Sequence, residues 1–200
     1  MCERLGVPAD LVLEQCLDLY LNHGTTLAGL VARGHVIDFD EWHAAVHGCL
    51  DYERYLAPDP ALRALLLSIP LPLYVFTNAD DAHTTRCLSI LGVADCFQGV
   101  VTFEGVMASA RDAGLVHHNR PVVCKPNRQA YHAALRCMGG RDPARTLWLD
   151  DSTRNIQTGH HLGMMTVLVG RTCVDCPSHL QIKDVSACRR CLLLPHAAVW

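Results

Sequence analysis

The sequence lacks a basic stripe, a long hydrophobic run and the layout of a signal peptide. Its 200 residues contain 17 lysines and arginines against 20 aspartates and glutamates, a formal net charge of −3, so we expect no nucleic-acid partner. No apolar run approaches the length of a membrane span, and the opening MCERLGVPADLVLEQ places acids among apolar residues. We therefore expect a protein of the cytoplasm or the nucleus, without a membrane role, whose eleven cysteines are reduced.

Two kinds of hydrophobic pattern divide the chain. Half of the residues are hydrophobic and 18% are charged, which is typical of a chain that folds around a core. Apolar residues recur at helical spacing within 9–21, 26–33 and 40–50, so the first part of the chain is expected to be all-helical. We accordingly expect a helical part over residues 1–55, an α/β part over 56–172 and a tail of different character over 173–200.

The α/β part alternates strands with helices. Asp59 and Pro60 mark a helix start, and Gly92 marks the end of a helix over 81–91. Further helices are expected near Tyr131 and from Ser152, and residues 104–120 read as a loop. The first expected strand ends at Thr77, and the other three cover residues 99–103, 146–149 and 165–170. This alternation predicts a parallel sheet.

Polar residues of complementary chemistry stand at the ends of these strands or beside them. Thr77 and Asn78 follow the first strand, Lys125 precedes a helix, and Asp150 and Asp151 follow the strand TLWL. Two adjacent carboxylates repel each other unless a cation or hydrogen-bond donors neutralise them. Each residue alone could close a turn, stay solvated or cap a helix. Together they supply the hydroxyl, amide, ammonium and carboxylate groups that hold a phosphoryl group and Mg²⁺.

Three of these stretches resemble motifs of the haloacid dehalogenase superfamily of phosphohydrolases. YVFTNAD resembles its second motif, VVCKP its third and LWLDDSTRNIQTG its fourth. Within the superfamily, the sequence is most similar to the pyrimidine 5′-nucleotidase-like branch of plants and fungi. That branch carries YxNxGTTxAGL in a helical cap, matched here from Tyr20 to Leu30, and DDSxRNIxTG in its fourth motif. The resemblance implies an α/β fold, a Rossmann-like parallel sheet core with an all-helical cap.

The resemblance also implies a role for each strand-end residue. Thr77 and the backbone N–H of Asn78 would bind phosphate, and Lys125, the catalytic residue of the set, would neutralise charge on the nucleophile and the phosphoryl oxygens. Asp151 would ligate Mg²⁺ directly, with Asp150 ligating it or acting through water. The implied reaction is Mg²⁺-dependent dephosphorylation of a small-molecule phosphomonoester, a pyrimidine nucleoside monophosphate.

The cap motif implies a substrate contact as well. In that interpretation Gly24, Thr25 and Thr26 help to select the nucleotide, whereas the plain alternative is an ordinary turn between two helices. No protein partner is indicated.

The superfamily's nucleophile motif, Asp-x-Asp-x-Thr at the end of a strand before the cap, has no match. The nearest candidate is Asp38-Phe39-Asp40, which we reject because Trp42 stands where threonine belongs and no long apolar run precedes it. The strand that carries this motif is central in the fold, and each buried backbone group that loses its partner costs about 1–3 kcal/mol. We therefore expect a core without its central first strand, from a truncated isoform or gene model, with weak or no activity.

Two rival functions stay open. The chain could be a catalytically inactive relative that binds phosphate, Mg²⁺ or a protein partner. Alternatively, the pairs Cys173-x₂-Cys176 and Cys188-x₂-Cys191 could bind Zn²⁺ tetrahedrally and stabilise an interaction module. Because the tail also departs from the family pattern, we treat zinc binding by these cysteines as the lesser expectation.

Overall fold

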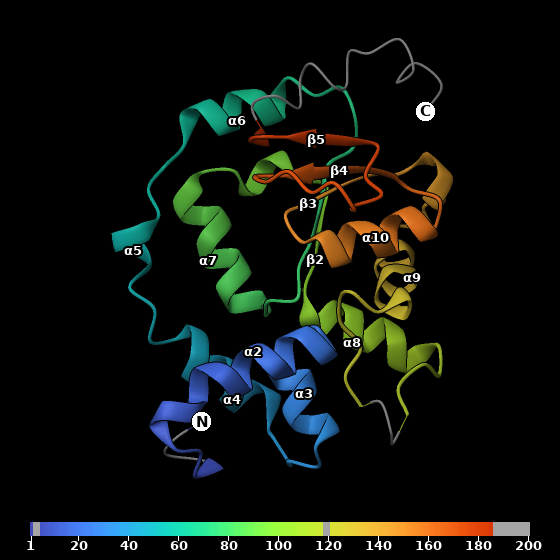
Figure 1. Ribbon diagram of the computed structural model, residues 1–200. Coiled ribbons are helices and arrows are strands. Elements are labelled where there is room, and N and C mark those ends of the chain that lie inside the picture. Colours follow the sequence, from blue (N-terminus) through green and yellow to red (C-terminus); the bar gives the residue numbers. More distant parts are fainter. Residues whose placement is uncertain (2–4, 118–120, 186–200) are drawn as a thin grey trace.

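The computed structural model describes residue 1 and residues 5–117 and 121–185. A group of helices opens the chain; most of it lies at one end of the molecule, shown in blue in Figure 1, while its last short helix, over residues 52–55, lies apart at one side. These helices are η1 (Ala9–Leu11), α2 (Val12–His23), α3 (Thr26–Ala32), α4 (Phe39–His47) and α5 (Tyr52–Tyr55). Helices α2 and α3 pack against each other. We call this group the cap.

The remaining elements form the core. They are α6 (Pro60–Leu67), β1 (Tyr74–Phe76), α7 (Asp81–Leu91), η2 (Ala94–Cys96), β2 (Gly99–Val101), α8 (Phe103–Asp112), α9 (Arg128–Cys137), η3 (Pro143–Arg145), β3 (Leu147–Asp150), α10 (Thr153–His161), β4 (Met165–Val169) and β5 (Leu180–Ile182). In Figure 1, α7 lies to one side of the strands and α9 and α10 lie to the other. Strands therefore run between two helical layers, as in other α/β folds.

The strands form two parallel sheets. One pairs β1 with β2, so that Val75 faces Val100, and the other has the order β3-β4-β5, with Leu149 facing Val167. Within the described residues no strand joins β1 to β3. The predicted α/β fold with parallel strands is confirmed. Strand β5 lies in the segment that we assigned to the tail; the three-part division itself stays a prediction.

Aromatic side chains fill the space between β1 and β3. The Phe76 and Trp148 rings lie 5.5 Å apart, and the ring of Tyr131, a buried residue of α9, lies 5.4 Å from Phe76 and 5.6 Å from Trp148. The Tyr131 ring meets each of the other two rings edge to face, which is a favoured arrangement for aromatic pairs, and the Phe76 and Trp148 rings are tilted relative to each other. These three rings connect the two sheets through side chains where a ladder of backbone hydrogen bonds is absent among the described residues.

One sequence-based prediction is wrong: residues 104–120 are not simply a loop. Helix α8 occupies 103–112 and buries Phe103, Val106, Met107 and Ala110 against the core, at the spacing of one helical face. Strand β2 correspondingly ends at Val101 rather than at Phe103. The small and polar residues between the four apolar positions conceal this face when the sequence is scanned for hydrophobic runs.

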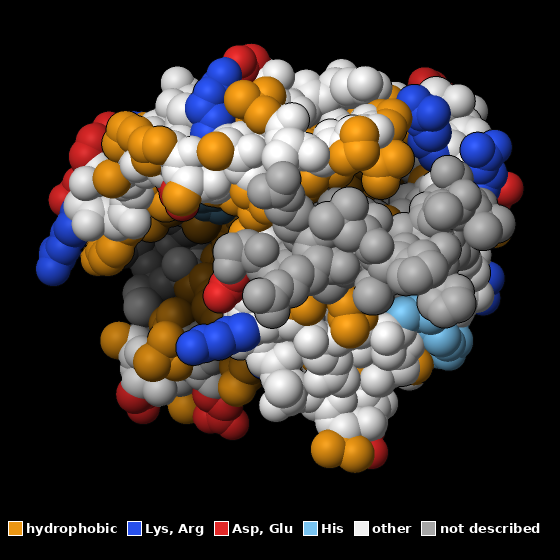
Figure 2. Space-filling view, turned by 90° about the horizontal axis from the view of Figure 1, so that it is seen from above, with side chains coloured by type: hydrophobic (Ala, Val, Ile, Leu, Met, Phe, Trp, Pro, Cys, Tyr) orange, Lys and Arg blue, Asp and Glu red, His pale blue; other side chains and the backbone are white. Residues whose placement is uncertain are grey.

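Several hydrophobic side chains stay exposed. On α6 the side chains of Leu62, Leu65 and Leu66 are only half-buried, and Leu67 is exposed. Figure 2 shows hydrophobic side chains gathered around a hollow on the face seen from above. No helix in the described part of the chain combines the length and apolar character that a membrane crossing requires.

Candidate functional site

Thr77 and Asn78 leave β1 and turn back toward the third motif. The backbone N–H of Thr77 donates to the Val101 carbonyl, and its hydroxyl oxygen accepts a hydrogen bond from the Ala79 N–H. The Asn78 side chain clamps the Lys125 backbone: its Oδ1 accepts from the Lys125 N–H at 2.8 Å and its Nδ2 donates to the Lys125 carbonyl at 3.0 Å. The second and third motifs are thus joined by two hydrogen bonds, and a cis peptide follows at Lys125–Pro126.

Lys125 carries its ammonium group into the gap between β1 and β3. The residue is 9% exposed, and its Nζ donates to the Phe76 carbonyl at 2.9 Å and to Asp150 Oδ2 at 3.1 Å. The Phe76 and Trp148 rings lie 4.9 and 4.8 Å from Nζ. A buried ammonium requires such compensation, because burial without partners disfavours its charge.

The two aspartates have different surroundings. The Asp150 side chain is 6% exposed; its Oδ1 accepts from the Ser152 N–H and from Asn155 Nδ2, and its Oδ2 accepts from Lys125 Nζ and Asn155 Nδ2. A carboxylate offers about four acceptor positions, so Asp150 is saturated. Asp151 is exposed, and no described residue pairs with it.

The cap touches this site through the turn between α2 and α3. Gly24 lies so close to the third motif that a Cβ there would meet the Lys125 carbonyl oxygen at 2.3 Å. The Thr25 hydroxyl oxygen accepts from the Ala28 N–H and caps α3, while it lies 3.9 Å from the Cys124 thiol. Thr26 begins α3. The structure brings Gly24 and Thr25 next to the site, while the part of all three cap residues in substrate selection stays a prediction.

Gly24→Ala is expected to loosen the cap from the core. Gly24 has φ +93° and Gly34 has φ +90°, so alanine at either position carries the strain of a positive φ. Only at Gly24 does the new Cβ also collide with the Lys125 carbonyl; no atom lies within 4 Å of it at Gly34. Denaturant unfolding should show Gly24→Ala less stable than Gly34→Ala by about 1–3 kcal/mol, the usual cost of overpacking. Equal losses would show that this contact carries no stability.

Sequence reasoning missed Asn155, which donates to both oxygens of Asp150. A signal was present: Ser152 is the N-cap of α10, and Asn155 stands three residues later, where a side chain reaches back over the helix start. Arg154, one residue earlier, donates to the Tyr20 carbonyl and connects α10 to the cap. Within the fourth motif, Asn155 thus holds Asp150 in place, and Arg154 links α10 to the cap.

Cys124 and Asp38 are further residues with a nucleophilic side chain, and neither is suited to attack phosphorus. Burial raises the pKa of the Cys124 thiol to about 11, so this neighbour of Lys125 is a poor nucleophile near neutral pH. Asp38 caps α4, where its Oδ1 accepts from the Glu41 N–H, and it does not follow a strand. This agrees with the rejection of the Asp38-Phe39-Asp40 stretch as the nucleophile motif.

The proposed cysteine site for zinc lies only partly within the described residues. Cys176 is buried against Ile156 and Leu168, and the backbone of Cys173 pairs with the Gln181 side chain. Cys188 and Cys191 lie outside the described residues. Zinc binding by these two pairs stays a prediction.

Comparisons with solved structures show the same fold at low sequence identity. The L-2-haloacid dehalogenase from Xanthobacter autotrophicus with covalently bound chloropropionic acid is 14% identical, with a TM-score of 0.58 over 92% of this chain and 82% of that one. A HAD phosphatase from Thermococcus onnurineus is 17% identical, with a TM-score of 0.57 over 96% of this chain and 84% of that one. At such identities the likeness concerns the fold.

Sequence comparisons identify the family. The chain is 27% identical over 176 residues to Phosphate metabolism protein 8 of Saccharomyces cerevisiae, covering 82% of this chain and 51% of that protein. The chain thus spans about half the length of the curated relative it matches. The family model for haloacid dehalogenase-like hydrolases matches residues 14–163, which is more than half of the chain and includes all three motifs. The chain therefore belongs to the haloacid dehalogenase-like hydrolase family.

Proposed function

We propose that these residues form the phosphate- and Mg²⁺-binding part of a phosphomonoester hydrolase. The observation that carries the proposal is the position of Lys125 Nζ, held between the Phe76 carbonyl and Asp150 Oδ2 at the ends of β1 and β3. Thr77 follows the same strand as Phe76, and Asp151 follows the same strand as Asp150. An ammonium, a hydroxyl and an accessible carboxylate at one edge of a sheet suit a phosphate dianion and a divalent cation.

The carboxylates divide the work between them. Asp151 fits Mg²⁺ because it is exposed and unpaired within the described part of the chain, and Mg²⁺ binds through one or two carboxylates together with phosphate oxygens. Asp150 has no acceptor position left for an ion, so its role is to fix Lys125. When bound, Mg²⁺ would neutralise charge on the phosphoryl group. Thr77 and the Asn78 N–H would bind the phosphate oxygens, and Lys125 would stabilise the charge that develops on them.

The proposed substrate is a pyrimidine nucleoside monophosphate. This choice rests on the resemblance of the cap turn and of the fourth motif to the pyrimidine 5′-nucleotidase-like branch. It is supported by the similarity to a yeast protein named for phosphate metabolism and by the placement of Gly24 and Thr25 beside Lys125 and Cys124.

A Mg²⁺ titration tests the metal assignment. Calorimetry should show Mg²⁺ binding to the wild-type chain, strengthened by inorganic phosphate because the ion then gains phosphate oxygens. Asp151→Asn should weaken Mg²⁺ binding at least about tenfold, or roughly 1.4 kcal/mol. The matched control is Asp112→Asn, which removes an exposed carboxylate at the end of α8. Equal affinities for Asp151→Asn, Asp112→Asn and the wild type would remove the metal assignment.

A second candidate function is phosphate or Mg²⁺ binding without turnover. It is favoured by one observation: within the described residues, Asp150 is the sole carboxylate paired with Lys125, and all its acceptor positions are occupied. No carboxylate there stands ready to attack phosphorus. Binding of Mg²⁺ and phosphate without release of phosphate from a monophosphate would select this function.

A further inference from the structure

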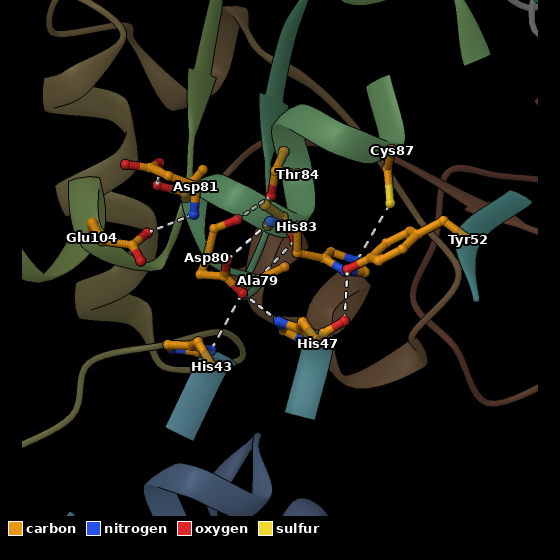
Figure 3. Close-up of polar contacts among 12 residues, drawn as sticks. His43, His47, Tyr52, Ala79, Asp80, Asp81, His83, Thr84, Cys87 and Glu104 are labelled. Carbon is orange, nitrogen blue, oxygen red and sulfur yellow. Dashed lines mark hydrogen bonds and ion pairs between the residues drawn. The ribbon is translucent and has the colours of Figure 1, made fainter. Parts of the chain in front are cut away.

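A second group of potential metal ligands lies between the cap and the core, apart from the Lys125 site. His43 and His47 stand four residues apart on α4, so both imidazoles lie on one face of the helix. Asp80, at the start of α7, meets them: its Oδ2 lies 3.4 Å from His43 Nδ1 and contacts His47 Nδ1. One ligand atom from each residue lies within 4.8 Å of the other two (Figure 3).

Burial makes this cluster unusual. His43 is 8% exposed and neither of its ring nitrogens has a hydrogen-bond partner. An unpaired buried polar group costs about 1–3 kcal/mol, so the sequence would gain by replacing His43 unless its nitrogen binds something. The Nδ1 atom is directed at Asp80, as the dashed line in Figure 3 shows.

Neighbouring residues hold Asp80 and the backbone of His47 in place. Asp80 Oδ1 accepts from the His83 N–H at 2.9 Å, and the Thr84 hydroxyl donates to the Asp80 carbonyl at 2.8 Å, which leaves Oδ2 directed at the imidazoles. The Tyr52 hydroxyl lies 3.1 Å from the His47 carbonyl oxygen and 2.8 Å from His83 Nδ1.

We propose that His43, His47 and Asp80 bind one Zn²⁺ ion that ties the cap to the core. Two imidazole nitrogens and one carboxylate form a known ligand set for zinc, with water in the fourth position. Two ligands at about 2.0–2.1 Å from a tetrahedral ion are roughly 3.3 Å apart, close to the 3.4 Å between His43 Nδ1 and Asp80 Oδ2. The ion would separate His47 from Asp80 and give His43 the partner that it lacks.

This ion has a structural consequence. Both histidines belong to the cap, whereas Asp80 follows β1 in the core by four residues. Zinc would therefore add a cross-link between the cap and the core beside the existing contact of the Tyr52 hydroxyl with His83, apart from the Gly24 and Tyr20 contacts near the Lys125 site. The alternative without metal is a hydrogen-bonded pair between His47 and Asp80, with His43 Nδ1 left 3.4 Å from Asp80 Oδ2 and without a hydrogen bond.

Zinc titration separates these alternatives. The tested protein is the full chain with Cys173→Ser and Cys188→Ser, so that neither cysteine pair keeps both of its thiols. It should bind about one Zn²⁺ per chain and melt at a higher temperature when zinc is present, because a ligand that binds only the folded state stabilises it. His47→Gln and Asp80→Asn should each lose at least about tenfold in zinc affinity. The matched control His35→Gln, at an exposed histidine of the same cap, should keep it.

Two results would overturn the proposal. One is loss of all zinc binding in the cysteine-substituted chain; the other is unchanged affinity in His47→Gln. Because a substitution at the cluster could itself unfold the chain, Co²⁺ binding to the cysteine-substituted chain provides a second measurement. Visible absorption of a tetrahedral ion without thiolate charge-transfer bands supports nitrogen and oxygen ligands, whereas thiolate bands contradict them. Asp151→Asn should leave zinc binding unchanged, which keeps this test independent of the proposed phosphatase site.

Discussion

A longer chain, with a strand bearing Asp-x-Asp-x-Thr placed before residue 1, is expected to release phosphate from uridine and cytidine monophosphates at least about a thousandfold faster than the 200-residue chain. Removal of a nucleophile in hydrolases costs several orders of magnitude, while the remaining binding and electrostatic groups leave residual catalysis. In the proposed site those groups are Thr77, Lys125 and Asp151. Asp150 is saturated, and no described residue presents a carboxylate for attack at Lys125.

The structure also indicates how an added strand would change the site. Lys125 Nζ now donates to the Phe76 carbonyl, a backbone group on the open edge of β1. A strand paired there would offer its own N–H to such carbonyls. The ammonium would then keep Asp150 as its partner and turn its remaining donors toward a phosphoryl group. The added strand is therefore expected to supply the nucleophile and to free part of Lys125.

The comparison requires Mg²⁺ in both samples and one further control. The extended chain with asparagine for the first aspartate of the new motif should fall back to the rate of the 200-residue chain. If the 200-residue chain already matches the extended one, the nucleophile is among its own residues, and Asp38→Asn and Asp40→Asn become the next variants to assay. An extended chain that is no faster than its asparagine variant would contradict the assignment of the missing motif.

The sequence contains enough information to predict where the candidate site residues meet. Thr77 and Asp151 follow parallel strands, and the carboxyl ends of parallel strands share one edge of a sheet. Lys125 reaches Asp150 at this shared edge, where its Nζ lies 3.1 Å from Asp150 Oδ2. The different states of the two aspartates were not predictable, because they depend on Asn155 and Lys125, which reach Asp150 from two other elements.

The zinc cluster illustrates a second limit. The spacing of His43 and His47 is readable as two ligands on one helical face. The third ligand, Asp80, belongs to another element and comes close only when the cap packs against the core. For the same reason the burial of His43, which makes it a ligand candidate, is a property of the fold rather than of any short stretch of sequence.

The strongest single effect on stability is expected at Lys125. Lys125→Met keeps most of the side-chain length and removes the charge, so the buried carboxylate of Asp150 loses its cation. Breaking one half of a buried ion pair costs about 3–5 kcal/mol. The lower end applies here, because the Ser152 N–H and Asn155 Nδ2 still donate to Asp150. Urea unfolding should therefore show Lys125→Met less stable than the wild type by about 3 kcal/mol.

The double variant Lys125→Met with Asp150→Asn distinguishes a lost ion pair from a simple packing defect. Asparagine keeps an acceptor for the Ser152 N–H but carries no charge, so the double variant should be more stable than the sum of the two single losses predicts, by about 1 kcal/mol or more. Arg33→Met serves as the matched control, because its ion pair with Asp18 is half-exposed and should contribute about 1 kcal/mol or less. Strictly additive losses at Lys125 and Asp150 would mean that the lysine stabilises the fold through Phe76 and Trp148 alone. In that case Asp150 would not be the residue that holds Lys125 in the site.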